Sequence, residues 1–580
     1  MFGFLTNALT VNPSKHQAAL ASSTSKDTTG SISAYLKRKF FSFSRIIPLF
    51  FVAVLLAGCG NTVAFIDYDN RLISQAEAGT VFSSVTVPAA PVRAGYIFTE
   101  WKEVNGTATI AANATSYRPT KSITFFQAQY RLEGDYAVSF YDANLEFLGV
   151  EGVSKGNSID LSNKYGISNW YKVGQSASIS GAFTPTEDIT LYASAGVTEV
   201  KTQTELAAIN RNAASLAGRY ILQSDIALGA GVGFDVEGWF PIGYNQNNPF
   251  TGVFNGNGHT ISGLWINSPS TDYIGLFGTI KGGEVKNLGV VIDTYGIRGD
   301  KHVGGIVGYI TDGSITNSYT KGNVDGYFYV GGIAGISYHS DIINSYTTGS
   351  VSGTGEYIGG IAGAVWNYGS IVSSYATGNV NGVGAVGGIA GENSRGSIAI
   401  SYSTGNVNTN RIAGGIVGTS DGGSIANSYA TGSVSGTDEH IGGIVGYSNS
   451  GTSIVNSYST GIIGGPTAKN VGGITGFAYG SSITNNVAIN PSISGSENVN
   501  RVVGYIKDIY SNTILNNLAR SNLASPSDDD AYAGLGTPDN QFKLEGVYVN
   551  LGWYFNATTG IWKIDSSKNN GYPYLYWQAL

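Results

Sequence analysis

Cysteine and charge are both scarce in this sequence of 580 residues, and each shortage excludes a class of protein. The single cysteine, Cys59, excludes a disulfide framework and a zinc site built from several cysteines. Charged residues form only 12% of the chain, about half of the usual share, and the formal net charge is −7. Because proteins bind nucleic acids through a clustered basic face, we expect no nucleic-acid partner.

Signatures of catalysis and of metal or cofactor binding are also missing. The sequence has no His-Glu-x-x-His motif, no phosphate-binding glycine loop followed by Lys-Ser or Lys-Thr, and no metal-ligand spacing among its five histidines. We therefore predict no metal, no cofactor and no enzymatic activity. The enzymatic alternative, a β-helical polysaccharide lyase or hydrolase, would need clustered carboxylates on one face. The acidic residues between 304 and 500 stand at different positions of a repeat described below, so we expect most of them on different faces.

The residues that are abundant favour β structure. Glycine accounts for 82 residues and tyrosine for 36, and 42% of all residues are hydrophobic. This aromatic content is too high for a disordered chain, and the glycines follow no strict triplet, which excludes collagen. Frequent turn residues combined with few charges predict short strands whose surfaces are polar but uncharged.

An export signal stands near the N-terminus. Basic residues at 37–39 and 45 precede an apolar run at 46–57, which is shorter than the roughly 20 residues of a membrane-spanning helix. This order is typical of a secretory signal peptide, and the alternatives are a short membrane anchor or a buried helix. Residues 1–35 are polar and have no role in export, so we expect translation to begin nearer Leu36.

The tetrapeptide Leu56-Ala57-Gly58-Cys59 ends this apolar run and resembles the lipobox of bacterial lipoproteins. The resemblance implies that Cys59 is lipidated and becomes the new N-terminus, with acyl chains that hold the protein in a membrane. Gly60 and Asn61 do not provide the aspartate retention signal of Gram-negative lipoproteins. We therefore expect an exported protein that is lipid-anchored to the cell envelope, at the outer membrane or the cell surface.

Two related units follow the signal. The first contains segments 95–101 and 119–128, and the second contains Trp170 and segment 184–193. Both units resemble the internalin B-repeat family of bacterial surface proteins, and this resemblance implies two small β-grasp-like modules in series. We expect Trp101 and Trp170 to be core residues; the alternative is that they stack on a ligand.

From residue 304 onward the sequence repeats itself. Gly-Gly-Ile begins at residues 304, 331, 359, 387, 414, 442 and 472, in steps of 27 to 30 residues. A second block, such as Ser314-Ile315-Thr316-Asn317-Ser318-Tyr319, follows in each copy, and most copies close with Thr-Gly-x-Val. Each copy thus offers three short β-prone pieces separated by turn residues, with no stretch of helical length. This pattern predicts a stack in which each copy forms one coil of a parallel β-helix.

Such stacking places equivalent residues of successive coils above one another, at the strand spacing of about 4.8 Å. We expect an inward isoleucine column, a packed or half-exposed tyrosine column, and an asparagine ladder at a corner with left-handed backbone. The expected members are Ile315, Ile342, Ile371, Ile398, Ile425 and Ile454; Tyr319, Tyr346, Tyr375, Tyr402, Tyr429 and Tyr458; and Asn317, Asn344, Asn427, Asn456 and Asn485. The blocks resemble the GLUG-motif repeat family of bacterial surface proteins, which implies a repeat scaffold and carries no catalytic residue.

Both ends of the stack carry candidate caps, which would protect the open strand edges. Thr202 and Glu205 have capping-box spacing and predict a short helix to about Asn210, and an aromatic group from Trp553 to Trp577 would form a lid. The predicted fold is all-β, with a parallel β-helix of about nine coils and capped ends preceded by two small modules. The predicted organisation is an extension and signal peptide at 1–58, modules at 59–135 and 136–198, an N-terminal cap and first degenerate coil at 199–303, the repeats at 304–500, and a degenerate last coil with an aromatic cap at 501–580.

A specific function must lie in the positions that vary between copies, because the core positions recur. Tyr338 and Trp366 each stand seven residues after a Gly-Gly pair, so we expect them in one column on neighbouring coils, with His339 and Tyr368 beside them. Aromatic residues beside polar ones suit sugar rings or a protein hot spot; the alternative is that they only cover a corner of the helix. We predict a surface-anchored binding or adhesion protein for a carbohydrate or for a host or neighbouring protein. The alternative is a purely structural component of an envelope or filament.

Overall fold

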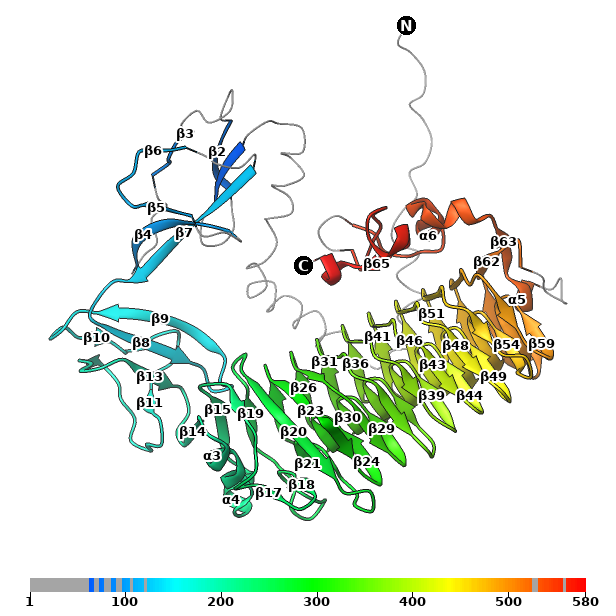
Figure 1. The fold of residues 1–580 in the computed structure, drawn as a ribbon, viewed down its shortest axis with the longest axis horizontal. Coiled ribbons are helices and arrows are strands. Elements are labelled where there is room, and N and C mark those ends of the chain that lie inside the picture. Colours follow the sequence, from blue (N-terminus) through cyan, green and yellow to red (C-terminus); the bar gives the residue numbers. More distant parts are fainter. Residues whose placement is uncertain are drawn as a thin grey trace, which may run out of the picture.

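The computed structural model describes residues 62–66, 72–77, 85–89, 96–104, 108–118, 123–523, 530–556 and 560–579. It shows two small β modules followed by a long parallel β-solenoid, which confirms the predicted all-β fold (Figure 1). The predicted signal peptide and Cys59 lie outside the described residues. Among the helices that are described, none is long and apolar enough to cross a membrane.

The same strand arrangement recurs in both modules. The first has β1 (Thr62–Ile66), β2 (Leu72–Glu77), β4 (Tyr96–Glu103), β5 (Thr109–Ala111) and β7 (Ile123–Leu132), beside β3 (Val85–Thr86) and β6 (Ser116–Tyr117); the second has β8 (Tyr136–Tyr141), β9 (Phe147–Val153), β11 (Tyr171–Lys172) and β13 (Ile189–Tyr192), beside β10 (Ile159–Asp160) and β12 (Ala182–Phe183). In each module the first strand pairs antiparallel with the second and parallel with the last. Trp101 and Trp170 are buried against Phe65 and Phe140, at ring-centroid distances of 5.1 and 4.9 Å, and both are core residues as expected.

The second module packs directly on the first coils of the solenoid. Tyr192 of the module belongs to one buried cluster with Ile221 of the solenoid. The buried Lys286 lies 3.0 Å from the carboxylate of Glu146, which ties the fourth strand of the first solenoid sheet to the module. Next along the chain come α3 (Gln203–Ala207), a short 3₁₀ turn (Ala208–Asn210) and α4 (Ala213–Leu216), and the capping box between Thr202 and Glu205 is formed as predicted.

Each full coil contributes strands to four sheets, and the solenoid has about ten turns. In one coil these are β25 (Val307–Thr311), β26 (Ser314–Thr316), β27 (Tyr319–Lys321) with β28 (Val324–Gly326), and β29 (Phe328–Gly331). The sequence predicted three strands for each coil, which is wrong. The block from Ser314 to Tyr319 turns at Asn317, where φ is 50°, and the chain turns again at the Gly-Gly pair, so that two of the three expected pieces are divided.

We number the four sheets from 1 to 4. Sheet 1 comprises β14 (Val197–Val200), β15 (Arg219–Leu222), β19 (Val253–Asn255), β22 (Glu284–Lys286), β26, β31 (Asp341–Ile343), β36 (Ser370–Val372), β41 (Ser397–Ala399), β46 (Ser424–Ala426), β51 (Ser453–Val455), β56 (Ser482–Thr484) and β61 (Thr513–Leu515). Sheet 2 runs from β16 (Ile226–Ala227) through β20 (Thr260–Asn267), β23 (Gly289–Arg298), β27 and β28 to β62 (Leu518–Arg520) and β63 (Leu535–Thr537). Sheet 3 comprises β21 (Phe277–Lys281), β25, β30 (Ala334–Tyr338), β35 (Ala362–Trp366), β40 (Ala390–Ser394), β45 (Val417–Asp421), β50 (Val445–Asn449), β55 (Thr475–Ala478) and β60 (Val503–Ile506). Sheet 4 comprises β24 (Lys301–Gly304), β29, β34 (Ile358–Gly359), β39 (Ala385–Gly387), β44 (Ile412–Gly414), β49 (Glu439–Gly442), β54 (Lys469–Gly472) and β59 (Glu497–Asn500).

The expected columns are present. The six isoleucines from Ile315 to Ile454 lie in strand register and are fully buried. The tyrosines from Tyr319 to Tyr458 form a continuous stack with ring centroids 4.8 to 5.0 Å apart, which we call the tyrosine ladder. The corner asparagines have φ near +50°, and the Asn344 side-chain amide donates to Asn317 at 3.1 Å. Equivalent residues of successive coils therefore stack in the core, in the tyrosine ladder and at the asparagine corner.

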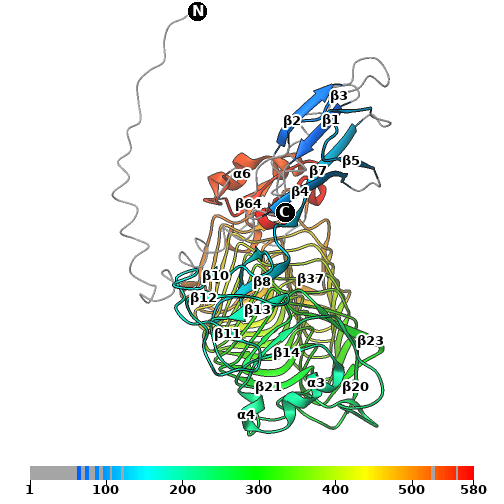
Figure 2. The same ribbon diagram turned by 90° about the vertical axis from the view of Figure 1, so that its left-hand side faces the viewer.

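The C-terminal aromatic residues do not form the lid over the last coil that the sequence predicted. They belong to a segment, residues 539–556 and 560–579, that turns back along the side of the solenoid; we call it the strap (Figures 1 and 2). It contains α6 (Glu545–Asn550), β64 (Trp562–Lys563) and β65 (Tyr574–Leu575) and three 3₁₀ turns at Asp539–Lys543, Asn569–Gly571 and Tyr576–Ala579. The end of the stack is covered instead by α5 (Asp530–Ala533) and β63.

The strap is held by the tyrosine ladder because that ladder offers an apolar edge beside unused corner acceptors. Trp562 and Trp577 pack against the ladder, with Trp577 5.5 Å from the ring of Tyr402. Three indole N–H groups donate to corner residues of different coils: Trp577 to the Ile400 carbonyl at 3.3 Å, Trp562 to Asn427 Oδ1 at 3.3 Å, and Trp553 to the Asn485 carbonyl at 2.8 Å. The strap thus contacts several C-terminal coils along one side of the solenoid. It does not cover Tyr319 and Tyr346, which are half-buried.

Candidate ligand-binding groove

A second aromatic stack runs along the outer side of sheet 4. Tyr273, His302, Tyr329 and Tyr357 occupy equivalent positions of four coils, with ring centroids 4.7, 5.4 and 5.2 Å apart and planes within 10° of parallel. All four have positive φ, between 54° and 66°. Left-handed backbone is strained for bulky side chains and tends to persist at functional sites. The short distances and near-parallel planes mean that each ring covers the face of the next.

The stack is interrupted in the next two coils. The equivalent positions carry Ala385 and Ile412, and His440 follows. A neighbouring column on sheet 3 shows the complementary pattern, with Glu392 and Thr419 followed by Tyr447, Phe477 and Tyr505. Residues without rings therefore stand at the same height on two adjoining sheets.

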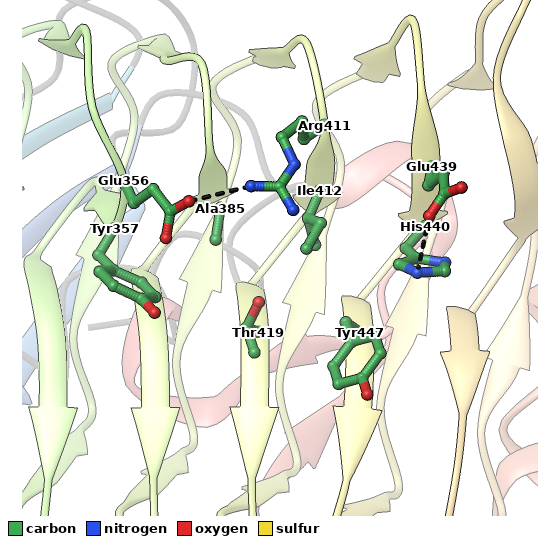
Figure 3. Close-up of a pocket in the computed structure, with 9 residues that line it drawn as sticks. All are labelled: Glu356, Tyr357, Ala385, Arg411, Ile412, Thr419, Glu439, His440 and Tyr447. Carbon is green, nitrogen blue, oxygen red and sulfur yellow. Dashed lines mark hydrogen bonds and ion pairs between the residues drawn. The ribbon is translucent and has the colours of Figure 1, made fainter.

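The interruption produces a groove with a volume of about 320 Å³ (Figure 3). Tyr357 closes one end, and Tyr447 with His440 closes the other. Three coil steps separate Tyr357 from His440, so the two ends stand roughly 14 Å apart at the spacing of parallel strands. The groove is lined by Glu356, Tyr357, Ala385, Arg411, Ile412, Thr419, Glu439, His440 and Tyr447.

Carboxylates dominate the charge of this groove. Glu356 pairs with Arg411 across its rim, at 3.0 Å between Oε1 and Nη1. Glu392, one coil before Thr419 in the same column, accepts a hydrogen bond from Trp366 Nε1 at 2.7 Å. Burial raises the pKa of Glu392, and the nearby charges of Asp421 and Glu356 raise it further. Burial lowers the pKa of His440 to about 4, so this imidazole is neutral near pH 7 and adds no positive charge.

The four candidate ligand-binding residues proposed from the sequence lie in different surroundings. Tyr338 and Trp366 are paired in register on β30 and β35, as expected. Trp366 turns toward the groove, because its indole holds Glu392 and its ring lies edge-on to Tyr329 at 5.3 Å. Tyr368 is 78% exposed at a corner, and His339 pairs with Asp312 at 2.7 Å. Only Trp366 of the four is thus tied to the groove.

The acidic residues of the groove were missed because we expected them on different faces. Glu356, Arg411 and Glu439 each stand three residues before a Gly-Gly pair, so they occupy the same position in their coils. That shared position precedes the aromatic column and points the three side chains to one rim (Figure 3). Counting backwards from the Gly-Gly pairs would have found this cluster.

Comparison with known proteins identifies the repeats. A family model for the GLUG motif matches residues 299–325, 354–381 and 409–435. Halomucin of Haloquadratum walsbyi is 34% identical over 137 residues, which are 22% of this chain and 1% of that protein. A Gly-rich membrane protein of Evansella cellulosilytica is 44% identical over 79 residues, which are 13% of this chain and 9% of that protein. The chain therefore spans less than a tenth of either relative.

One solved structure also resembles the chain. It is described as an immunoglobulin A1 protease from Bacteroides ovatus; the likeness covers 66% of this chain and 92% of that one, at 19% identity and a TM-score of 0.28. The GLUG matches lie on coils of the solenoid, at the repeats that the sequence singled out. Three segments of the solenoid are accordingly GLUG motif repeats.

Proposed function

We propose that this protein is a ligand-binding scaffold for adhesion, displayed on a bacterial cell envelope. The observation that carries the proposal is the interrupted aromatic stack, which creates a concave, polar site on an otherwise regular surface. A rigid solenoid suits this role because it holds a site at a fixed place on a long face. The two relatives support an envelope location, since one is named as a membrane protein.

We further propose that the anchor is a lipid at Cys59, which follows the lipobox-like Leu56-Ala57-Gly58. Changing Cys59 to Ala should move the protein from the membrane fraction to the soluble fraction of cells, because acyl chains supply most of the membrane affinity. Detergent phase partitioning of the wild-type and Cys59→Ala proteins measures this directly. A variant that stays in the detergent phase to the same extent would exclude lipid anchoring at this residue.

Binding is best tested by probing glycan and protein arrays with the mature protein. We expect a small set of related ligands, and we expect them to be recovered uncleaved, as a binding role requires. An array that stays blank at high protein concentration would favour the alternative, a structural envelope component without a specific ligand. Recovery of shortened glycans would favour the other alternative, a polysaccharide-degrading enzyme.

A further inference from the structure

The interruption leaves Tyr357 as the last ring of its stack, beside the groove. Tyr357 stacks on Tyr329 on one side, and Tyr447 stacks on Phe477 on one side, at 4.7 Å. Phe328 lies T-shaped to Tyr357 at 6.0 Å, and the His440 ring lies tilted against Tyr447 at 5.3 Å, so Tyr357 is the tyrosine that offers a ring face to the groove. An open aromatic face in a recess is a favourable surface for the apolar face of another ring.

The depth of the gap matches a bound ring. Each coil of the stack occupies about 4.8 Å, which is the distance at which the resident rings pack on one another. Ala385 provides only a methyl group at the first vacant position, next to Tyr357. Ala385 also lacks the positive φ of the four stacked rings, so the space beside Tyr357 is left free for a ring of the ligand.

The polar lining restricts what that ring can carry. Ionised carboxylates accept hydrogen bonds but donate none, so Glu356 and Glu439 require a ligand with several donors. Thr419 adds a hydroxyl that can donate or accept. Hydroxyl groups around a saturated ring meet both demands, because the ring presents an apolar face and a donor-rich edge.

Charge excludes a further class of ligand. Glu356 and Glu439 line the groove, Asp421 stands beside it, and Arg411 is the one cation among its lining residues. Glu356 already neutralises Arg411. An acidic sugar would bring another carboxylate against uncompensated charge of the same sign, whereas a neutral or amino sugar would not.

We propose that the groove binds a neutral or amino-bearing pyranose ring of a glycan, stacked on Tyr357 in the place left vacant at Ala385. This proposal rests on the ligand-binding function proposed above and names its substrate class. Glu356 and Thr419 hold hydroxyl groups at the edge of the ring. Trp366 is a positioning residue, because it holds Glu392 and does not itself line the groove.

Filling the vacant place is the sharpest test. We would titrate the mature protein with tetramers of glucose, of glucosamine and of galacturonic acid, and measure affinity by calorimetry. Wild type should bind at least one of the first two and bind the galacturonate tetramer at least about tenfold more weakly. Ala385→Tyr should reduce the affinity for the bound tetramer at least about tenfold, because residue 385 lines the groove and a phenol ring there would fill much of its volume.

Two matched controls separate loss of the site from loss of the fold. Ala385→Ser keeps the groove open and should bind like wild type. Tyr357→Ala removes the stacking face and should weaken binding, whereas Tyr327→Ala removes a tyrosine that is 45% exposed and outside the groove lining, and should not. Circular dichroism and thermal melts of each variant establish that it is folded.

The outcomes distinguish this proposal from the proposed function. If none of the neutral or amino tetramers binds while the arrays reveal another ligand, the function stands and the sugar proposal is overturned. Equal binding of galacturonate, or full binding by a folded Ala385→Tyr variant, also overturns it. If both the arrays and the tetramers are blank, the proposed function fails together with it.

Discussion

Replacing Trp562 by Ala should destabilise the C-terminal half of the solenoid by about 3–5 kcal/mol, the usual cost of removing a fully buried tryptophan. Its ring stacks on Trp553 at 4.7 Å and lies 5.8 Å from Tyr458, so it is the centre of the contact between strap and ladder. Its Nε1–H also donates to Asn427 Oδ1 at 3.3 Å, and the alanine variant leaves that acceptor without this donor.

Hydrogen exchange is the appropriate measurement, because long repeat arrays do not unfold as a single unit. Amides of coils 402–487 should exchange faster in Trp562→Ala, whereas those of coils 304–346 should not change. Val549→Ala is the matched control, since Val549 belongs to the same strap on α6 but is 48% exposed. Unchanged protection near Tyr429 and Tyr458 in Trp562→Ala would show that the strap adds no stability.

Gly387→Ala should cost at least about 3 kcal/mol, at the upper end of overpacking substitutions. A Cβ atom at residue 387 would lie 1.9 Å from the Ala390 carbonyl oxygen and 2.7 Å from the Gly418 nitrogen. Both are backbone atoms of the tight corner between sheets 4 and 3, and neither can move without shifting a coil. The reason for glycine here is close approach of the backbone, since residue 387 has no positive φ.

The control for this variant is Gly546→Ala, at a helical position on α6. A Cβ atom there meets nothing within 4 Å, so alanine should be neutral or stabilise the helix by up to about 1 kcal/mol. Denaturant midpoints and soluble yield of both variants provide the comparison. A Gly387→Ala protein as stable as wild type would mean that the corner is looser than these distances indicate.

The repeating part of the fold could be predicted because each column has a local sequence signal. The period placed Ile315 above Ile342, and asparagine at the corner indicated left-handed backbone. The strap could not be predicted in the same way. Trp577 contacts Ile400, 177 residues earlier, and nothing in the strap's own sequence identifies the side of the solenoid on which it docks.

The groove was hidden for a different reason. The groove exists because Ala385 and Ile412 have no aromatic ring. This absence becomes apparent only when the strand register shows that both residues are equivalent to Tyr357 and His440. The sequence did identify Trp366, because an aromatic residue at a variable position can be recognised without knowing which strands are paired. Tyr368 and His339 were identified in the same way, but they lie at an exposed corner. Residue type alone therefore pointed to the region that contains the groove and not to the groove itself.

The strap also limits how this protein can change its length during evolution. Tandem repeats gain or lose whole copies, and a solenoid normally tolerates this because each coil contacts only its neighbours. Here three indoles are matched to the corners at Ile400, Asn427 and Asn485. Adding or losing a coil between them would displace an indole from its acceptor by about 4.8 Å. Because Trp577 also stacks on Tyr375 at 5.9 Å, we expect a change in copy number to be tolerated best in the coils before Tyr375, which the strap does not contact.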